Sequence, residues 1–129
     1  MESVEFLELA DLVQIHIDQI TNYGGSIEIR DVGLLESAIE QPRATFDGAF
    51  LHGFPFEMAA AYLFHIVMNH PFVDGNKRTG TVAALVFLDW NGIVIEGHPG
   101  EISDLTIAVA SGLASKGEVA DFFERHSRK

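Results

Sequence analysis

The chain has 129 residues, 47% of them hydrophobic, and its eight basic against nineteen acidic residues give a formal net charge of −11. This charge opposes general binding to DNA or RNA, and no apolar run reaches the roughly 18 residues of a membrane span. The acidic start MESVEFLELADLV does not resemble a secretory signal, and the absence of cysteine fits a reducing cytoplasm. A single domain over residues 1–129 is expected.

Two helices are predicted before residue 42. Apolar residues recur on one helical face over residues 9–20, and Gly24-Gly25 supply a stop. His16 falls on that apolar face, so it is interpreted as a core histidine. Asp31 can cap a second helix, which Pro42 ends.

The stretch RATFDGAFLHGFPF, residues 43–56, contains a short hairpin signal, because Asp47-Gly48 tolerate positive φ between two extended pairs. One interpretation is an irregular loop with buried aromatic residues. The other is a projecting flap that pairs with an extended partner segment. The residues of this possible substrate flap are Thr45, Phe46, Asp47, Gly48, Ala49 and Phe50.

Two stretches, residues 57–70 and 79–90, are apolar nearly all round and predict a pair of central helices. Residues 93–95 form a short extended piece. Ser103 and Ser115 are predicted to cap two last helices, Ser115 through a capping box with the glutamate three residues later. The fold class is therefore mainly α, with a loop joining the two central helices.

That loop, HPFVDGNKRTG, concentrates chemically active side chains over residues 70–80. Residues 74–76 lie where the second central helix begins, and a helix start offers unpaired N–H groups and a positive dipole end to anions. Gly75 permits a tight backbone there. Lys77 and Arg78 are unfavourable against the dipole, and a bound polyanion would neutralise them.

Asp74 and His70 complete the chemistry of the loop. Asp74 can serve as an N-cap or as a ligand of Mg²⁺, which takes one or two carboxylates plus phosphate oxygens. His70 can take a proton from an incoming hydroxyl. Together these residues are typical of transfer of a phosphorus-containing group from a nucleotide to a hydroxyl. The alternative interpretation is a structural polar turn.

The other histidines carry weaker signals. His65 lies about 140° around the helix from His70, so the two rings do not converge, and His65 is interpreted as a core or supporting histidine. His52 and His98 lie in predicted loops at no metal-ligand spacing.

The nine residues HPFVDGNKR resemble the signature of the Fic/Doc (Fido) superfamily, H-x-F-x-[D/E]-G-N-[G/K]-R. Residues 30–39, RDVGLLESAI, resemble the Doc branch, the death-on-curing toxins of bacterial toxin–antitoxin operons. The resemblance spans essentially the whole chain and implies a Fido-type helical bundle. The matching positions are His70, Phe72, Asp74, Gly75, Asn76 and Arg78.

Lys77 distinguishes two activities within this superfamily. AMP-transferring Fic enzymes have glycine in place of Lys77 and a second arginine in place of Thr81. The Doc branch shares the lysine, which implies a kinase that binds ATP reversed and phosphorylates a threonine of elongation factor Tu, blocking translation. The founding Doc toxin has alanine in place of Gly75, so AMP transfer stays open, as does a catalytically inactive binding module.

The resemblance implies ATP as substrate and Mg²⁺ as cofactor. It also implies a general base (His70), a metal ligand (Asp74), phosphate-binding residues (Gly75, Asn76, Lys77 and Arg78) and an apolar anchor (Phe72). The chain lacks the inhibitory pattern [S/T]-x-x-x-E-[G/N] of many Fic proteins. Restraint is therefore expected from a cognate antitoxin, whose disordered C-terminal segment folds into a groove on the toxin.

Overall fold

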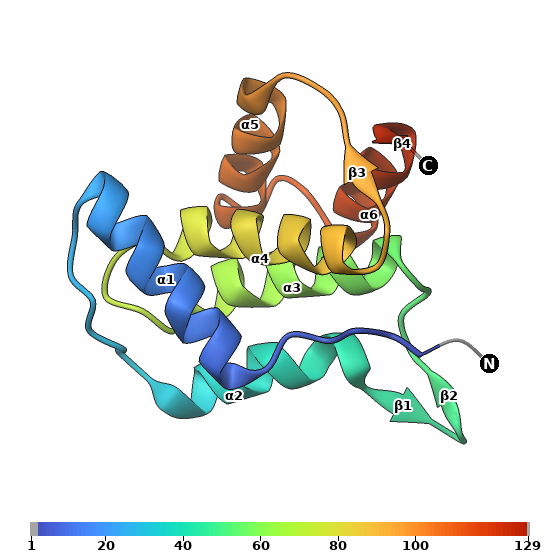
Figure 1. Ribbon diagram of the computed structural model, residues 1–129, viewed down its shortest axis with the longest axis horizontal. Helices are drawn as coiled ribbons and strands as arrows, with labels where there is room; N and C mark the ends of the chain where they lie inside the picture. The colour runs from blue at the N-terminus through green and yellow to red at the C-terminus, as the bar shows by residue number, and fades with distance from the viewer. Residues whose placement is uncertain (1–2, 129) are drawn as a thin grey trace.

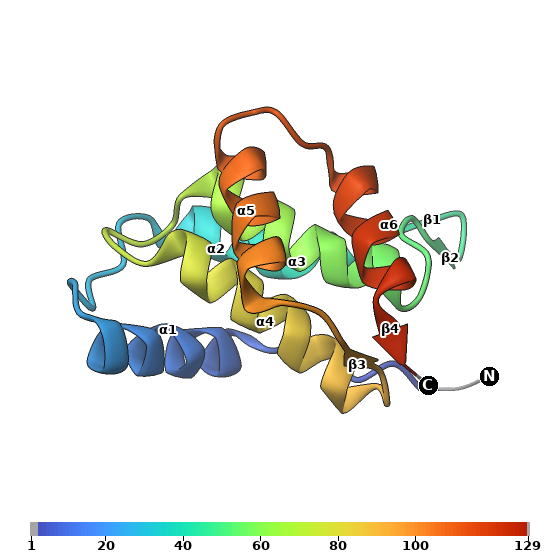
Figure 2. The ribbon, with the colours of Figure 1, turned by 90° about the horizontal axis from the view of Figure 1, so that it is seen from above.

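Two helices at the centre of the molecule run side by side in opposite directions (Figures 1 and 2). They are α3, Phe56–Asn69, and α4, Asn76–Trp90, in a computed structural model that describes residues 3–128. Most of α3 is buried, including the run from Met58 to Leu63. The predicted central pair and its connecting loop are confirmed.

Within residues 3–128, four further helices surround this pair. In Figure 1, α5 and α6 lie above the pair, α2 lies below it, and α1 runs obliquely at the left. Helix α1 contacts α4, α2 contacts α3, and both C-terminal helices contact the central pair. Their bounds are Leu9–Tyr23 for α1, Val32–Glu40 for α2, Pro99–Ala110 for α5 and Lys116–Arg125 for α6.

The predicted hairpin is also confirmed. Strands β1, Thr45–Phe46, and β2, Ala49–Phe50, pair antiparallel, and the turn between them has positive φ at both central residues. The hairpin projects from one end of the molecule (Figure 1). Phe46 is 74% exposed, so the interpretation as a loop with buried aromatic residues is wrong.

Helix ends follow the predicted signals with one exception. The Asp31 side chain accepts from the Leu34 N–H at the start of α2, and a 3₁₀ turn, Gln41–Arg43, follows that helix. Ser103 is not a cap, because α5 begins at Pro99. Proline is favoured at a first helical position, and the His98 N–H donates to the Glu101 carboxylate there.

The predicted extended piece after α4 forms strand β3, Val94–Ile95. It pairs antiparallel with β4, Ser127–Arg128, a strand that the sequence did not suggest. Among residues 3–128, no helix has both the length and the apolar character needed to cross a bilayer.

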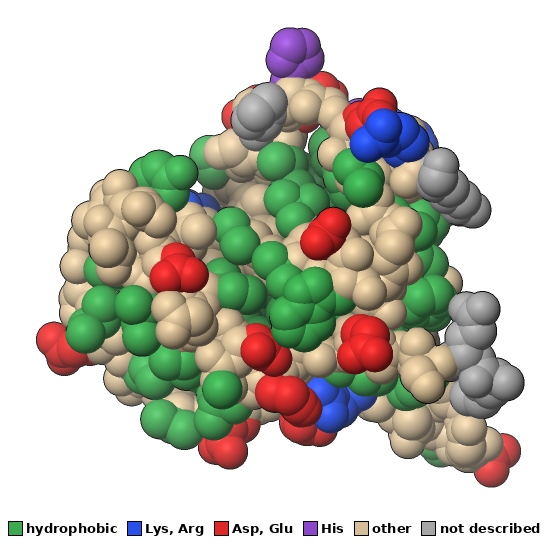
Figure 3. Space-filling view, viewed as in Figure 1, with side chains coloured by type: hydrophobic (Ala, Val, Ile, Leu, Met, Phe, Trp, Pro, Cys, Tyr) green, Lys and Arg blue, Asp and Glu red, His purple; other side chains and the backbone are tan. Residues whose placement is uncertain are grey.

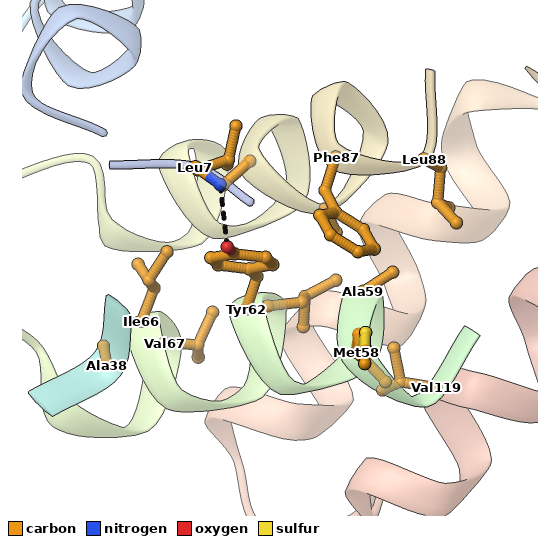
Figure 4. Packing of buried hydrophobic residues seen from close by; sticks show 14 of the residues in the cluster. Leu7, Ala38, Met58, Ala59, Tyr62, Ile66, Val67, Phe87, Leu88 and Val119 are labelled. Carbon is orange, nitrogen blue, oxygen red and sulfur yellow. Dashed lines mark hydrogen bonds between the residues drawn. The ribbon is translucent and has the colours of Figure 1, made fainter. Parts of the chain in front are cut away.

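The core joins both central helices to the N-terminal segment. Figure 4 shows Tyr62 of α3 beside Phe87 of α4, with the Tyr62 hydroxyl accepting from the Leu7 N–H at 2.9 Å. Burial raises the pKa of Tyr62 to about 12. The segment before α1 is therefore fixed against the helices that carry the reactive loop.

Candidate active site

The loop between α3 and α4 turns through two left-handed residues. His70 ends α3 with a φ of 52°, and Gly75 precedes α4 with a φ of 81°. Glycine adopts this conformation without steric cost, whereas it is uncommon for histidine. The backbone of His70 is therefore in an uncommon conformation, which contacts with neighbouring residues must hold.

One cavity of about 370 Å³ brings most of the predicted site residues together. His70, Asp74, Gly75, Asn76 and Lys77 all line it. The other lining residues are Val67, Val73 and Ala110 of α5.

Helix α4 has an open start. Among the residues that the structure describes, no side chain caps its first turn, and that turn contains no acidic residue. Within residues 3–128, the backbone N–H groups of Gly75, Asn76 and Lys77 donate no hydrogen bond. These groups and the helix dipole make a place where phosphate oxygens can bind.

Asn76 is 5% exposed, and its side chain organises the loop. Its Oδ1 accepts from the Phe72 N–H at 3.0 Å, and its Nδ2 donates to the Phe72 carbonyl at 2.9 Å. The same Nδ2 lies 3.2 Å from Nδ1 of His70. The Asn76 side chain is therefore engaged within the loop, and its backbone N–H is the group left open to a phosphate.

This contact defines the tautomer of a neutral His70. An amide nitrogen can only donate, so Nδ1 of His70 accepts and the ring proton lies on Nε2. To act as a base, His70 would use Nδ1 after leaving Asn76, or Nε2 in the other tautomer.

The connector between α1 and α2, residues 24–31, packs against the loop. Arg30 donates from Nε to the His70 carbonyl at 2.7 Å and from Nη2 to the Asn69 carbonyl at 3.0 Å. Ile29 and Phe72 form an isolated antiparallel bridge beside it. These contacts hold the left-handed end of α3.

Asp74 presents a partly free carboxylate. Its Oδ2 accepts from the Ser26 N–H at 2.8 Å, and the residue is exposed. No group of three or more His, Cys, Asp or Glu side chains able to hold a metal occurs in the part of the chain that the structure describes. Asp74 is the one carboxylate among the described residues that line this cavity; it could bind a Mg²⁺ ion only if phosphate oxygens of a ligand completed the coordination.

The Arg78 guanidinium is partly engaged. It donates from Nη1 to the Gln19 carbonyl at 3.2 Å and from Nη2 to the Gly24 carbonyl at 3.1 Å, and it lies 5.7 Å from the Tyr23 ring centroid. These bonds join α4 to the end of α1. The remaining N–H groups of the guanidinium are those that could contact a phosphate.

Lys77 also borders a second cavity, of about 440 Å³, between α1, α4 and α5. In Figure 3 the surface is hollowed between the regions of α1 and α5. On one wall, the hydroxyls of Thr81 and Thr106 lie 2.8 Å apart, which joins α4 to α5. Other lining residues are Gln19, Tyr23, Arg78, Val82, Ile102, Ser103 and Ile107.

His16 is buried, as predicted, and it also contacts the loop. Its Nε2 lies 2.8 Å from the Asp74 carbonyl oxygen, and its ring stacks on Phe72 with centroids 3.7 Å apart. Burial lowers the pKa of His16. Sequence reasoning did not find the loop contacts of His16, Ser26 or Arg30, because the partners are 39 to 58 residues apart in the chain.

A second polar cluster lies at the start of α6. Lys116 Nζ is 3.0 Å from Nε2 of His52 and 3.0 Å from Nε2 of His65. Burial lowers the pKa of all three residues, that of His65 to about 4. His65 is thus a hydrogen-bonded, half-buried histidine, in agreement with its interpretation as a core or supporting residue.

Comparison with known proteins places this loop in a family. The Fic/DOC family model matches residues 6–88. A protein named toxin Doc of Mycolicibacterium smegmatis is 44% identical over 71 residues, 55% of each chain. The protein kinase doc of Escherichia phage P1 is 36% identical over 115 residues, covering 89% of this chain and 90% of that kinase. The chain therefore belongs to the Fic/DOC family, and these relatives are both Doc proteins.

Proposed function

We propose that this protein is a Doc-type toxin kinase that transfers the γ-phosphate of Mg-ATP to a threonine of elongation factor Tu and so arrests translation. Lys77, beside the open start of α4 and in the cavity of His70, is the observation that carries this proposal. The named activity of the phage kinase, which aligns with 89% of this chain, supports it.

The transfer step uses groups that share one cavity. The acceptor hydroxyl attacks the γ-phosphorus, the bond from that phosphorus to the β,γ-bridging oxygen breaks, and ADP leaves with the bond electrons. His70 takes the hydroxyl proton. The open N–H groups at residues 75–77 and the Lys77 ammonium bind the phosphate oxygens, and Mg²⁺ held by Asp74 would offset their charge.

AMP transfer is the second candidate, because Gly75 matches the Fic signature. Two observations favour the kinase over it. The Lys77 side chain lines the cavity in which a glycine backbone would form an anion site. Thr81, at the position of the second Fic arginine, is bonded to Thr106 and offers no cation.

Labelled nucleotides separate the candidates. Purified protein, elongation factor Tu and Mg-ATP are expected to give a labelled factor from γ-labelled ATP, and no label from α-labelled ATP. His70→Ala should abolish the transfer, while its circular dichroism spectrum stays that of the unmodified protein. Label from α-labelled ATP alone would assign AMP transfer, and no label from either would assign an inactive binding module.

The partners follow from the same proposal. The hairpin β1–β2 projects with Phe46 exposed, so an extended segment of the substrate can pair with its edge. The cavity between α1, α4 and α5 is the candidate groove for the C-terminal segment of a cognate antitoxin. Because translation takes place in the cytoplasm, we expect the activity there.

A further inference from the structure

His16 lies outside the signature loop but donates a hydrogen bond into it. A carbonyl oxygen only accepts, so the 2.8 Å contact requires that Nε2 of His16 carry a proton and donate to the Asp74 oxygen. The ring is 1% exposed and stacks on Phe72 at an interplanar angle of 6°. The Nε2–H group and the ring of His16 are thus both fixed against the buried side of the loop.

This bond sets the direction of the next N–H group. The Asp74–Gly75 peptide is trans, and in a planar trans peptide the C=O and N–H point in opposite directions. With its carbonyl held toward His16, the peptide directs the Gly75 N–H away from that ring. Gly75 borders the cavity that also contains His70 and Lys77.

Without such a bond this peptide would rotate readily. Gly75 has no Cβ and sits at a φ of 81°, and glycine occupies both signs of φ at similar cost. Rotation would replace the Gly75 N–H with the Asp74 carbonyl oxygen, which repels phosphate. No other hydrogen bond to the Asp74 carbonyl occurs within residues 3–128.

We propose that His16 is a positioning residue: its hydrogen bond to the Asp74 carbonyl keeps the Gly75 N–H directed at the phosphate of the bound nucleotide. The proposal concerns the site of the proposed kinase and depends on that function only for its activity readout. His16 touches neither the phosphate nor the acceptor hydroxyl.

Two substitutions separate the donor from the aromatic ring. His16→Phe keeps the stack on Phe72 and removes the N–H, whereas His16→Gln places an amide N–H near the position of Nε2. We expect His16→Phe to lower kcat/KM for ATP about 100-fold, the usual cost of losing one aligned donor. We expect His16→Gln to recover activity to within about tenfold of the unmodified protein.

Amide NMR tests the geometry without any transfer reaction. Titration of inorganic phosphate should shift the Gly75 amide signal in the unmodified protein and in His16→Gln, and leave it unchanged in His16→Phe. If His16→Phe does not fold, the same titration of His16→Gln and of the unmodified protein decides the outcome. Phosphate that leaves the Gly75 amide unmoved in both would overturn the proposal.

Two other results would also overturn it. One is a folded His16→Phe that keeps full activity and the phosphate response. The other is a folded His16→Gln that fails as His16→Phe does, which would assign the effect to the imidazole itself. If the unmodified protein transfers no label from ATP, the kinase proposal fails while the NMR titration still tests His16.

Discussion

Helices α4 and α6 begin in opposite ways. At α6, Ser115 accepts from the Glu118 N–H at 3.1 Å, and the Glu118 carboxylate accepts from the Ser115 N–H at 3.0 Å. At α4, Gly75 stands in the capping position and Arg78 stands where α6 has Glu118. Helix α6 satisfies its own first turn, whereas within residues 3–128 the first turn of α4 stays open, as the proposed phosphate site requires.

The two lysines near these starts differ in the same sense. Lys116 is half-buried, and two neutral imidazoles accept its N–H groups. Lys77 is exposed, and it makes no side-chain hydrogen bond or ion pair in the part of the chain that the structure describes. The Lys116 ammonium thus has hydrogen-bond acceptors within the protein, whereas the Lys77 ammonium is available to the anion proposed to bind at α4.

The largest effect is expected from closing α4 with an acid. Gly75→Asp would place a carboxylate at the capping position, where it competes with phosphate for the N–H groups and repels it. Label transfer from γ-labelled ATP should fall about 100-fold or more. Gly75→Ala is the control, since its Cβ meets the same unfavourable positive φ and the same neighbours without adding a charge. Equal activity of the two variants would contradict the proposal that the open start of α4 binds phosphate.

An acid challenge addresses the cluster at α6. Burial holds the pKa of His65 at about 4, below its ordinary 6.5, so between these values the unfolded chain binds a proton that the folded protein does not. Stability therefore falls as pH drops from about 6.5 to 4. His65→Gln keeps an acceptor for Lys116 and cannot titrate there. Between pH 6.5 and 4, the free energy of unfolding of His65→Gln should therefore fall by roughly 1–2 kcal/mol less than that of the unmodified protein, after allowance for solvent screening. Denaturant unfolding measures this difference. Identical pH slopes would show that His65 does not titrate as described.

Opening α6 should destabilise the protein without affecting chemistry. Ser115→Ala removes the side-chain cap of α6, at a cost of about 1 kcal/mol in urea unfolding. Ser115→Asp, which restores an acceptor at the capping position, is the matched control. The rate of label transfer, measured well below the melting temperature, should stay unchanged in both. A loss of transfer in the folded Ser115→Ala protein would mean that α6 also supports the site.

The smallest effect is expected in the second turn of α4. Thr79 is fully buried, and its hydroxyl has no hydrogen-bond partner among residues 3–128, whereas the equivalent position of α6 is the buried Val119. Thr79→Val should raise the free energy of unfolding by up to about 1 kcal/mol, because it removes an unsatisfied polar group at nearly constant shape. Thermal unfolding measures this change, and a lower melting temperature would indicate that the hydroxyl has a partner.

Local patterns predicted most of the fold. The two apolar stretches, the Asp47-Gly48 turn and the Ser115 box each act within a few residues, and all three appear as expected. The prediction that Ser103 caps a helix was wrong because a serine acts as a cap only at the residue before a helix. Pro99 and Glu101 favour an earlier start of α5. The pairing of β3 with β4 joins segments more than 30 residues apart, beyond the reach of periodicity.

The candidate site was predictable as a set of residues and less so as a set of contacts. Four of the predicted residues lie within eight positions of one another in the sequence, so they can line the same cavity: His70, Asp74, Gly75 and Lys77. The engagement of Asn76 with Phe72 depends on the path of the loop, which the sequence does not reveal. The bonds of Arg78 to the end of α1 connect residues 54 and 59 positions apart.

The wall that α1 and its connector build around the loop has a consequence for how the protein is made. The bonds of His16, Ser26 and Arg30 to the loop close chain segments of 39 to 58 residues, and such closures carry an entropic cost before they form. During synthesis the N-terminal helix emerges first and has no loop to hold until α4 follows. A complete chain in which these closures have not yet formed therefore contains every residue of the signature but not the arrangement proposed to bind phosphate.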